Sequence, residues 1–192
     1  MIYLNFGYDA SIEVSKELGI CPKVQASSKH NLFRNCSTPK VERESCFGSD
    51  EIKSIYSFLG ISNFDQDLLL EEALTHATCI HSDVPCYQRL EWIGDAVVCL
   101  ASREFVYCTY PNLQVADLVI IETTLNCNET LAMLAHTKKL HNFIQHLDPS
   151  LPVRIELYAK GNKSKYGLWA TDPPKVLADI VESLIGAVHV GK

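Results

Sequence analysis

Four carboxylates stand out because they interrupt two strongly apolar segments of the chain. Glu91 and Asp95 lie in QRLEWIGDAVVCLASREFVY, and Asp179 and Glu182 lie in PKVLADIVESLIGAVHV. At 100° per residue, Gln88, Glu91 and Asp95 share a stripe about 60° wide on a helix that is otherwise apolar nearly all round. Each segment therefore predicts a helix that is buried on several sides and presents two carboxylates in a narrow polar stripe.

The second stripe also carries a cation. Lys175 shares it with Asp179 and Glu182, and Ser183 and Gly186 continue it. A buried, isolated carboxylate costs several kcal/mol unless it is paired, protonated or bound to a cation. If the two stripes face each other, the sequence predicts a divalent cation with hard oxygen ligands, Mg²⁺ or Mn²⁺. The alternative is that each acid is a solvated surface residue or a local helix-cap partner.

The elements that must position these acids are all predicted to be helices. Ser49 is a plausible N-cap for a helix that stops at Gly60. Further helices are predicted over residues 64–77, 87–108, 113–147 (two or three) and 173–190. Residues 151–172 are predicted to form a loop, because they contain Gly161, Gly167 and scattered lysines. Repeats and strand alternation are not evident, so the predicted fold class is all-α.

Composition divides the chain near residue 48. Residues 1–48 are predicted to be an N-terminal extension or linker, because much of this stretch mixes Ser, Pro, Lys and Asn with few periodic apolar positions. Residues 49–192 are predicted to be one folded domain, as the 47% hydrophobic content allows. We expect no membrane span and a soluble protein of the nucleus or cytoplasm. The eight cysteines form no CxxC pair, which predicts reduced, buried thiols.

The acidic segments resemble those of a known family. QRLEWIGDA (88–96) resembles the signature of the ribonuclease III endonuclease domain, and PKVLADIVESLIGAVHV (174–190) resembles its second acidic segment. LGISNFDQDLLLEEALTHAT (59–78) is similar to its opening helices. CYQRLE, with Gln88 where bacterial enzymes usually carry Glu, is most similar to the second ribonuclease III domain of Dicer and Dicer-like proteins, and plant and fungal ribonuclease-III-like proteins are a close second. The resemblance implies the family's endonuclease-domain helical bundle.

For function, the resemblance implies a metal-dependent endoribonuclease. The acidic positions that bind the catalytic Mg²⁺ in that family are matched by Glu91, Asp95, Asp179 and Glu182. Lys175 matches a lysine of Dicer-type domains that lies beside the metal, where it could stabilise developing negative charge. The implied reaction hydrolyses a phosphodiester of double-stranded RNA, leaving 5′-phosphate and 3′-hydroxyl ends, in RNA processing or small-RNA production (RNA silencing).

The implied partners are duplex RNA and a second domain. The family pairs two such domains through the face that bears the first signature helix, which implies a homodimer or a heterodimer with another ribonuclease III domain. Trp92 and Ile93 would lie in that interface; the alternative is that both pack within the monomer core. A formal net charge of −6 disfavours unaided binding of RNA, since phosphates are met by Lys or Arg. The basic stretch KGNKSK (160–165) is either a solvated loop or a phosphate contact.

Some features depart from the family pattern. Glu122, in IETTLNCNETLA, stands where the family usually carries a basic residue, and this charge reversal puts an RNA contact or a helix–helix brace at the position in doubt. A double-stranded-RNA-binding domain normally follows the second acidic segment, and whether the chain is a fragment of a larger Dicer-like protein stays open. The alternative function is a catalytically weak or inactive module for dimerisation or RNA-particle assembly. His76 is assigned a structural role, and the spacing of His136, His141 and His146 predicts no metal site.

Overall fold

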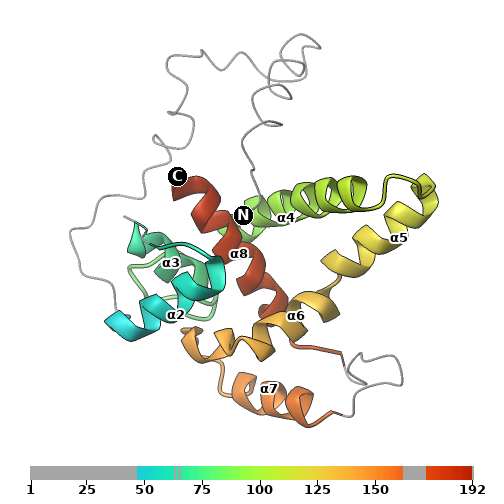
Figure 1. Cartoon of the computed structure of the whole chain (residues 1–192). Helices are drawn as coiled ribbons and strands as arrows, with labels where there is room; N and C mark the ends of the chain where they lie inside the picture. Colours follow the sequence, from blue (N-terminus) through green and yellow to red (C-terminus); the bar gives the residue numbers. More distant parts are fainter. Residues whose placement is uncertain (1–46, 63, 65, 162–171, 192) are drawn as a thin grey trace, which may run out of the picture. The chain divides into compact units, whose positions relative to one another are not determined.

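The computed structural model describes residues 47–62, 64, 66–161 and 172–191, and these form only helices and loops (Figure 1). The α-helices are α2 (Ser49–Leu59), α3 (Asp67–Leu74), α4 (Gln88–Thr109), α5 (Val115–Asn126), α6 (Asn128–Thr137), α7 (Leu151–Lys160) and α8 (Val176–Gly191), with a 3-10 helix η1 (Leu140–Phe143). Within the described residues an isolated bridge between Thr75 and Gln145 is the nearest approach to a strand. The predicted all-α fold class is confirmed. Most of the predicted extension over 1–48 lies outside the described residues.

Helix α2 begins and ends close to the predicted positions. Its N-cap is Gly48, one residue before the predicted Ser49, and the Gly48 amide donates to Glu51 Oε2 at 2.8 Å. It ends at Gly60, which adopts φ 66°, a left-handed conformation that glycine reaches without a Cβ penalty. The N-terminal boundary of the helical region is thus set by backbone and side-chain capping together.

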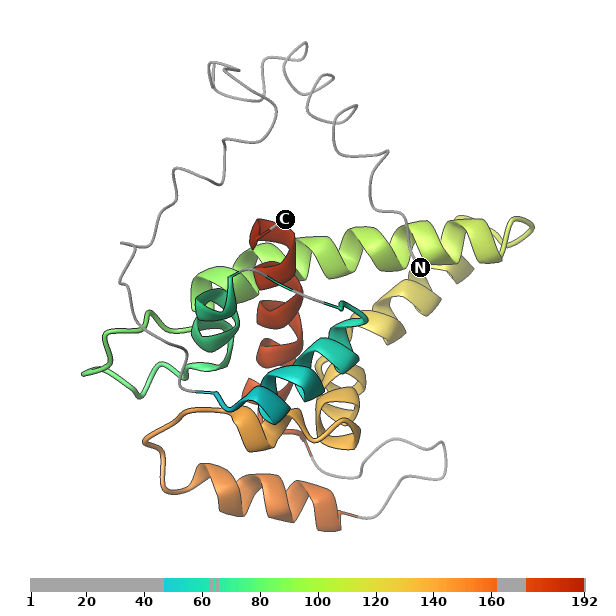
Figure 2. The ribbon, with the colours of Figure 1, turned by 60° about the vertical axis from the view of Figure 1, so that its left-hand side comes forward.

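Helix α8 lies at the centre of the domain. It packs against α3, α4, α6 and η1, and most of its residues are buried (Figures 1 and 2). Its Val, Leu, Ile and Ala side chains point to several sides, as a helix surrounded by others requires. Ser183 Oγ donates to the Ala73 carbonyl oxygen at 2.6 Å, which ties α3 to α8. The polar residues of α8 are therefore held in a fixed frame.

Two glycines let α4 and α8 approach within backbone contact. A Cβ added to Gly94 would lie 1.8 Å from the Glu182 carbonyl oxygen, and one added to Gly186 would lie 2.2 Å from the Leu90 carbonyl oxygen. No larger residue fits at either position without separating the helices. This close crossing brings the acidic stripe of α4 onto the acidic stripe of α8.

Helix α4 is less buried than its sequence predicts. Trp92 is 78% exposed, and Phe105 and Tyr107 are also exposed. Helix α5, which packs on α4, has no buried residue, and Val115 and Ile120 are 74% and 64% exposed. Figure 1 shows the second half of α4 and α5 extending away from α8. The prediction that α4 is buried on several sides by its own chain is therefore wrong. The apolar pattern shows that a surface favours burial, but it does not say whether the same chain or a partner buries it.

Residues 151–160 form a helix, so the predicted loop over 151–172 is wrong in its first part. Leu151, Ile155 and Tyr158 follow helical spacing and are buried in the core. Pro152 lies in the first turn, where its missing N–H costs nothing. Asp148 accepts hydrogen bonds from the Ser150 amide at 2.8 Å and from Arg154 at 2.8 Å, which fixes the start of α7. Residues 162–171 lie outside the described residues.

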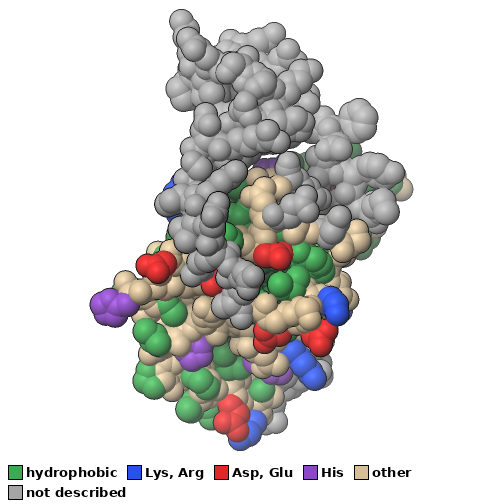
Figure 3. Space-filling model, turned by 90° about the vertical axis from the view of Figure 1, so that its left-hand side faces the viewer, with side chains coloured by type: hydrophobic (Ala, Val, Ile, Leu, Met, Phe, Trp, Pro, Cys, Tyr) green, Lys and Arg blue, Asp and Glu red, His purple; other side chains and the backbone are tan. Residues whose placement is uncertain are grey.

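The described surface mixes charged and apolar side chains. The face over α2 and α3 carries acidic and basic groups interspersed with small hydrophobic patches (Figure 3). Within the described residues, none of the helices has the length and apolar character needed to cross a bilayer. The described cysteines are unpaired, as predicted, but none is buried: Cys108 is exposed, and the others are half-buried (Cys79, Cys86, Cys99 and Cys127).

Candidate metal centre

Three carboxylates from two helices converge where α4 crosses α8. Glu91 comes from the first turn of α4, and Asp179 and Glu182 come from adjacent turns of α8. One carboxylate oxygen from each lies within 4.8 Å of the others. Asp179 is 4% exposed and Glu182 is 9% exposed. Three buried or half-buried carboxylates at this separation form the kind of oxygen cluster that holds a divalent cation.

The fourth predicted ligand lies just outside this cluster. Asp95 is one turn beyond Glu91 on α4 and is exposed. Its Oδ1 accepts a weak hydrogen bond from Cys99 Sγ at 3.6 Å. Its charge still acts on the cluster, since Asp95 contributes more than Asp179 or Glu91 to the raised pKa of Glu182. The structure thus brings three of the four predicted carboxylates together and leaves Asp95 beside them.

Lys175 occupies the cluster from one side. Its Nζ donates to Glu91 Oε1 at 2.8 Å and makes a short hydrogen bond to Asp179 Oδ1. Partial burial lowers the pKa of Lys175, but the hydrogen bonds to Asp179 and Glu91 outweigh this effect, so its pKa is raised. The lysine therefore stays protonated and links the α4 and α8 carboxylates.

Glu182 shows that the cluster carries more negative charge than it can neutralise. Burial, followed by the charges of Asp95, Asp179 and Glu91, raises the pKa of Glu182 to about 7, despite the opposing effect of Lys175. A divalent cation bound among these carboxylates would lower the pKa of such a carboxyl, because its positive charge offsets their negative charge. The possible ligands are hard carboxylate oxygens, and one of these acids, Glu182, has a raised pKa. Such a set fits Mg²⁺ or Mn²⁺.

A tyrosine that the sequence reasoning overlooked also contacts the cluster. The Tyr87 hydroxyl donates to Asp179 Oδ2 at 2.9 Å, and both groups are buried. The Tyr87 amide donates to the Thr75 carbonyl oxygen at 2.9 Å. Tyr87 is the residue immediately before α4. A buried tyrosine usually hydrogen-bonds through its hydroxyl, so its position one turn before Glu91 was the available signal.

The predicted structural role of His76 agrees with its contacts. The segment around it is clamped to residues 144–147: the His76 amide donates to the Gln145 carbonyl oxygen at 2.8 Å, and the Gln145 amide donates to Leu74 at 2.9 Å. The His76 ring lies 5.8 Å from the Tyr87 ring. Burial lowers the pKa of His76, which favours the neutral ring. The same segment accepts a hydrogen bond from the amide of Tyr87, the residue before α4, through the Thr75 carbonyl oxygen.

Glu122 acts as a helix–helix brace. Arg103 Nε on α4 donates to Glu122 Oε1 on α5 at 3.2 Å. Asn126 donates to the same Glu122 oxygen at 3.0 Å and to Ser102 Oγ at 2.8 Å. The charge reversal therefore does not remove a helix–helix brace from this position, because Glu122 supplies the acidic partner and Arg103 the basic one.

The histidines of the middle helices form a separate group. His136 and His141 stack with ring centroids 5.0 Å apart and planes 6° from parallel, which packs α6 against η1. His141 and His146 line a pocket of about 280 Å³ next to α7. Where the structure describes the chain, the acid cluster on α4 and α8 is the one group of three or more potential ligands that converges.

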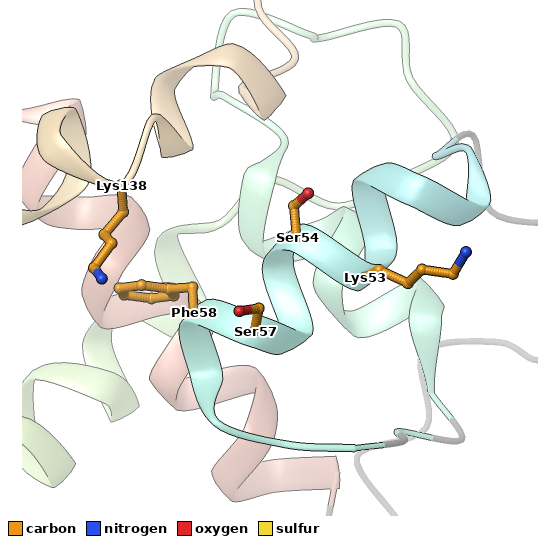
Figure 4. Close-up of a pocket in the computed structure, with 5 residues that line it drawn as sticks. All are labelled: Lys53, Ser54, Ser57, Phe58 and Lys138. Carbon is orange, nitrogen blue, oxygen red and sulfur yellow. The ribbon is translucent and has the colours of Figure 1, made fainter.

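Another pocket includes none of the acids in its lining. It measures about 360 Å³ and is lined by Lys53, Ser54, Ser57, Phe58 and Lys138 (Figure 4). The side chains of Lys53 and Lys138 do not point towards one another, so they form no shared anion site. Of the basic stretch at 160–165, residues 162–165 lie outside the described residues.

Comparison with known proteins identifies the family. The model of the ribonuclease III domain matches residues 88–192. The chain is 36% identical over 193 residues to Ribonuclease 3-like protein 2 of Arabidopsis thaliana, covering 97% of this chain and 49% of that protein. It is 40% identical over 148 residues to Ribonuclease 3-like protein 3 of Oryza sativa subsp. japonica, covering 74% and 48%. The chain thus spans about half the length of these relatives.

A larger relative and a solved structure agree with this assignment. Endoribonuclease Dicer homolog 1 of Arabidopsis thaliana is 31% identical over 201 residues, which cover 98% of this chain and 10% of that protein. The crystal structure of the nuclease domain of ribonuclease III from Campylobacter jejuni superposes with a TM-score of 0.55 at 25% identity, covering 73% of this chain and 83% of that domain. The predicted resemblance is confirmed, and the chain belongs to the ribonuclease III family.

Proposed function

We propose that this protein is a metal-dependent endoribonuclease that cleaves double-stranded RNA to 5′-phosphate and 3′-hydroxyl ends. The observation that carries this proposal is the convergence of Glu91, Asp179 and Glu182 within 4.8 Å at a crossing that two glycines make possible. Three carboxylates at this spacing repel one another, and Lys175 hydrogen-bonds to Glu91 and Asp179 only, so a cation bound here would offset the negative charge that remains.

Each residue of the site has a proposed role. Glu91, Asp179 and Glu182 bind and orient a divalent cation, and Asp95, exposed one turn away, completes the acidic set. A bound Mg²⁺ would supply Lewis-acid chemistry and a water of lowered pKa. Lys175, which is protonated and exposed on one side, is placed to offset negative charge on the phosphate. Glu182 must release its proton when the cation binds.

The RNA-competent form that we propose is a dimer, with a second copy or with another ribonuclease III domain. Trp92 and apolar side chains of α5 are exposed in the single chain. A dimer interface that buries them would be stabilised by the hydrophobic effect. Ile93 is half-buried, and its Cγ2 lies against Gly186, so it belongs mainly to the α4–α8 packing. The nuclease domain from Campylobacter jejuni contains a region involved in dimer formation.

The proposed setting is RNA processing or silencing, in the nucleus or cytoplasm, since Dicer homologs are among the relatives.

A second candidate function is a non-catalytic module for dimerisation or RNA-particle assembly. The net charge of −6 favours it, because non-specific affinity for RNA depends on basic side chains. Glu122 does not favour the non-catalytic module, because this residue forms the α4–α5 brace with Arg103.

Cleavage of long double-stranded RNA separates the two functions. The purified protein is incubated with RNA in Mg²⁺ or in EDTA, alongside Glu182→Gln and Asp95→Asn. Glu156→Gln is the matched control, because Glu156 is an exposed acid of α7 paired with Lys160. We expect Mg²⁺-dependent cleavage by the wild type and the control, and loss of cleavage in the other two variants. Absence of cleavage by a folded, RNA-bound wild type would favour the non-catalytic module.

A further inference from the structure

The two oxygens of Asp179 have different partners. Oδ2 accepts the hydrogen bond from the Tyr87 hydroxyl at 2.9 Å, whereas Oδ1 accepts the short hydrogen bond from Lys175. Asp179 is 4% exposed, so neither oxygen exchanges its partner freely for bulk water. The two oxygens of the carboxylate are therefore unequal: Oδ2 binds the Tyr87 hydroxyl, and Oδ1 binds the ammonium that also binds Glu91.

Tyr87 is held by its backbone as well as by its hydroxyl. Its amide donates to the Thr75 carbonyl oxygen at 2.9 Å, and its own carbonyl oxygen accepts from the Glu91 amide at 2.8 Å. Its ring lies 5.8 Å from the His76 ring, and the residue is 5% exposed. The carboxylate oxygen can only accept, so the Tyr87 hydroxyl is the donor in its contact with Asp179 Oδ2.

A carboxylate restrained in this way suits some cations better than others. Mg²⁺ and Mn²⁺ are small and six-coordinate, and they take one oxygen from each carboxylate. Ca²⁺ is larger, accepts six to eight ligands, and often takes both oxygens of one carboxylate. A hydroxyl that donates to Oδ2 leaves Oδ1, which the Lys175 ammonium shares with Glu91 Oε1, as the oxygen that a cation would reach by taking the place of the ammonium.

We propose that Tyr87 is a positioning residue that restricts Asp179 to coordination through Oδ1 and thereby gives the site its preference for small, octahedral cations over Ca²⁺. This inference rests on the proposed function, in which Asp179 is a metal ligand. It assigns to the segment that precedes α4 a direct part in choosing the cation. Tyr87 acts through Asp179 and does not itself touch the metal or the RNA.

The test measures Mn²⁺ and Ca²⁺ binding to the full, RNA-free chain by calorimetry, for wild type and Tyr87→Phe. The matched control is Tyr56→Phe, because the Tyr56 hydroxyl also donates to an aspartate, Asp67, at 2.6 Å, outside the acid cluster. We expect Tyr87→Phe to weaken Mn²⁺ binding about tenfold, as loss of a ligand-orienting hydrogen bond does, and Ca²⁺ binding by no more than about twofold. Melting curves in EDTA confirm that both variants are folded.

The ratio of the two affinities decides the outcome. A fall in the Mn²⁺-to-Ca²⁺ ratio in Tyr87→Phe, with no change in Tyr56→Phe, would support the assignment. An equal change in both affinities, or no change in either, would overturn it even if the wild type cleaves RNA in Mg²⁺, and the proposed function would then stand alone. If the wild type neither binds Mn²⁺ nor cleaves RNA, the proposed function fails, and this inference fails with it.

Discussion

Replacing Gly94 with alanine tests the helix crossing on which the acid cluster depends. Two effects of opposite sign compete. Alanine has the higher helix propensity, which would stabilise α4 by about 1 kcal/mol. The new Cβ, however, would lie 1.8 Å from the Glu182 carbonyl oxygen and 3.1 Å from the Gly186 amide nitrogen. These neighbours are backbone atoms, so no side chain can rotate away to make room.

The size of the required shift determines which effect prevails. Cβ atoms essentially never approach within 3.0 Å, so the helices must separate by roughly 1.2 Å, the difference between 3.0 and 1.8 Å. Overpacking of this kind costs about 3 kcal/mol. Subtracting the gain in propensity leaves a net loss of about 2 kcal/mol, which lowers the melting temperature by about 4–8 °C in a domain of this size. The same separation moves Glu91 away from Asp179 and weakens cation binding.

Thermal or urea unfolding in EDTA tests this prediction, because it measures the stability of the metal-free protein and requires no catalytic activity. Gly48→Ala is the matched control, because its Cβ would meet only Glu51 Oε2 at an ordinary 3.6 Å, and we expect its stability to change by less than about 1 kcal/mol. A melting temperature of Gly94→Ala at or above that of the wild type would mean that propensity prevailed. The close α4–α8 crossing would then be refuted.

Further predictions concern charge and surface. In metal-free protein the pKa of Glu182 is raised from 4.5 to about 7. Its contribution to stability is therefore fully present below pH 4.5 and is lost as the pH rises through 7. Melting temperatures measured across this pH range should show the fall, and Glu182→Gln should remove it. Lys175→Ala should lower the melting temperature in EDTA and enlarge the rise on adding Mg²⁺, because the ammonium bridging the carboxylates is removed. Trp92→Glu should abolish self-association in sedimentation, whereas Leu157→Glu, similarly exposed on α7, should not; equal effects would contradict the proposed dimer face.

The acidic helices could be predicted from the sequence because each combines strong helical periodicity with rare interruptions. The apolar positions of α8 predicted its burial, and the spacing of Asp179 and Glu182 predicted that both lie on one face. Periodicity does not give the relative axial position of two helices. For that reason the sequence could not indicate that Asp95 falls outside the cluster formed by Glu91 and the α8 acids.

The errors have identifiable physical causes. The prediction of a loop over helix α7 rests on Gly161, Gly167 and scattered lysines, but the glycines lie after the helix, and the spacing of Leu151, Ile155 and Tyr158 is helical. The sequence does not identify Tyr87 as part of the site, because its hydroxyl contacts a residue 92 positions away along the chain. Contacts of that range depend on the tertiary arrangement, which local patterns do not encode.

The central position of α8 also has a consequence for protein synthesis. The hydrogen bond between Lys175 and Glu91 joins residues 84 positions apart, and the α4 side of the site is made first. At about 5–20 residues per second, a ribosome needs roughly 4–17 s to extend the chain from one partner to the other. During that interval α3, α4 and α6 lack the helix that they pack around. A nascent chain whose α8 has not yet emerged therefore has no assembled acid cluster, and translation itself delays the appearance of the site.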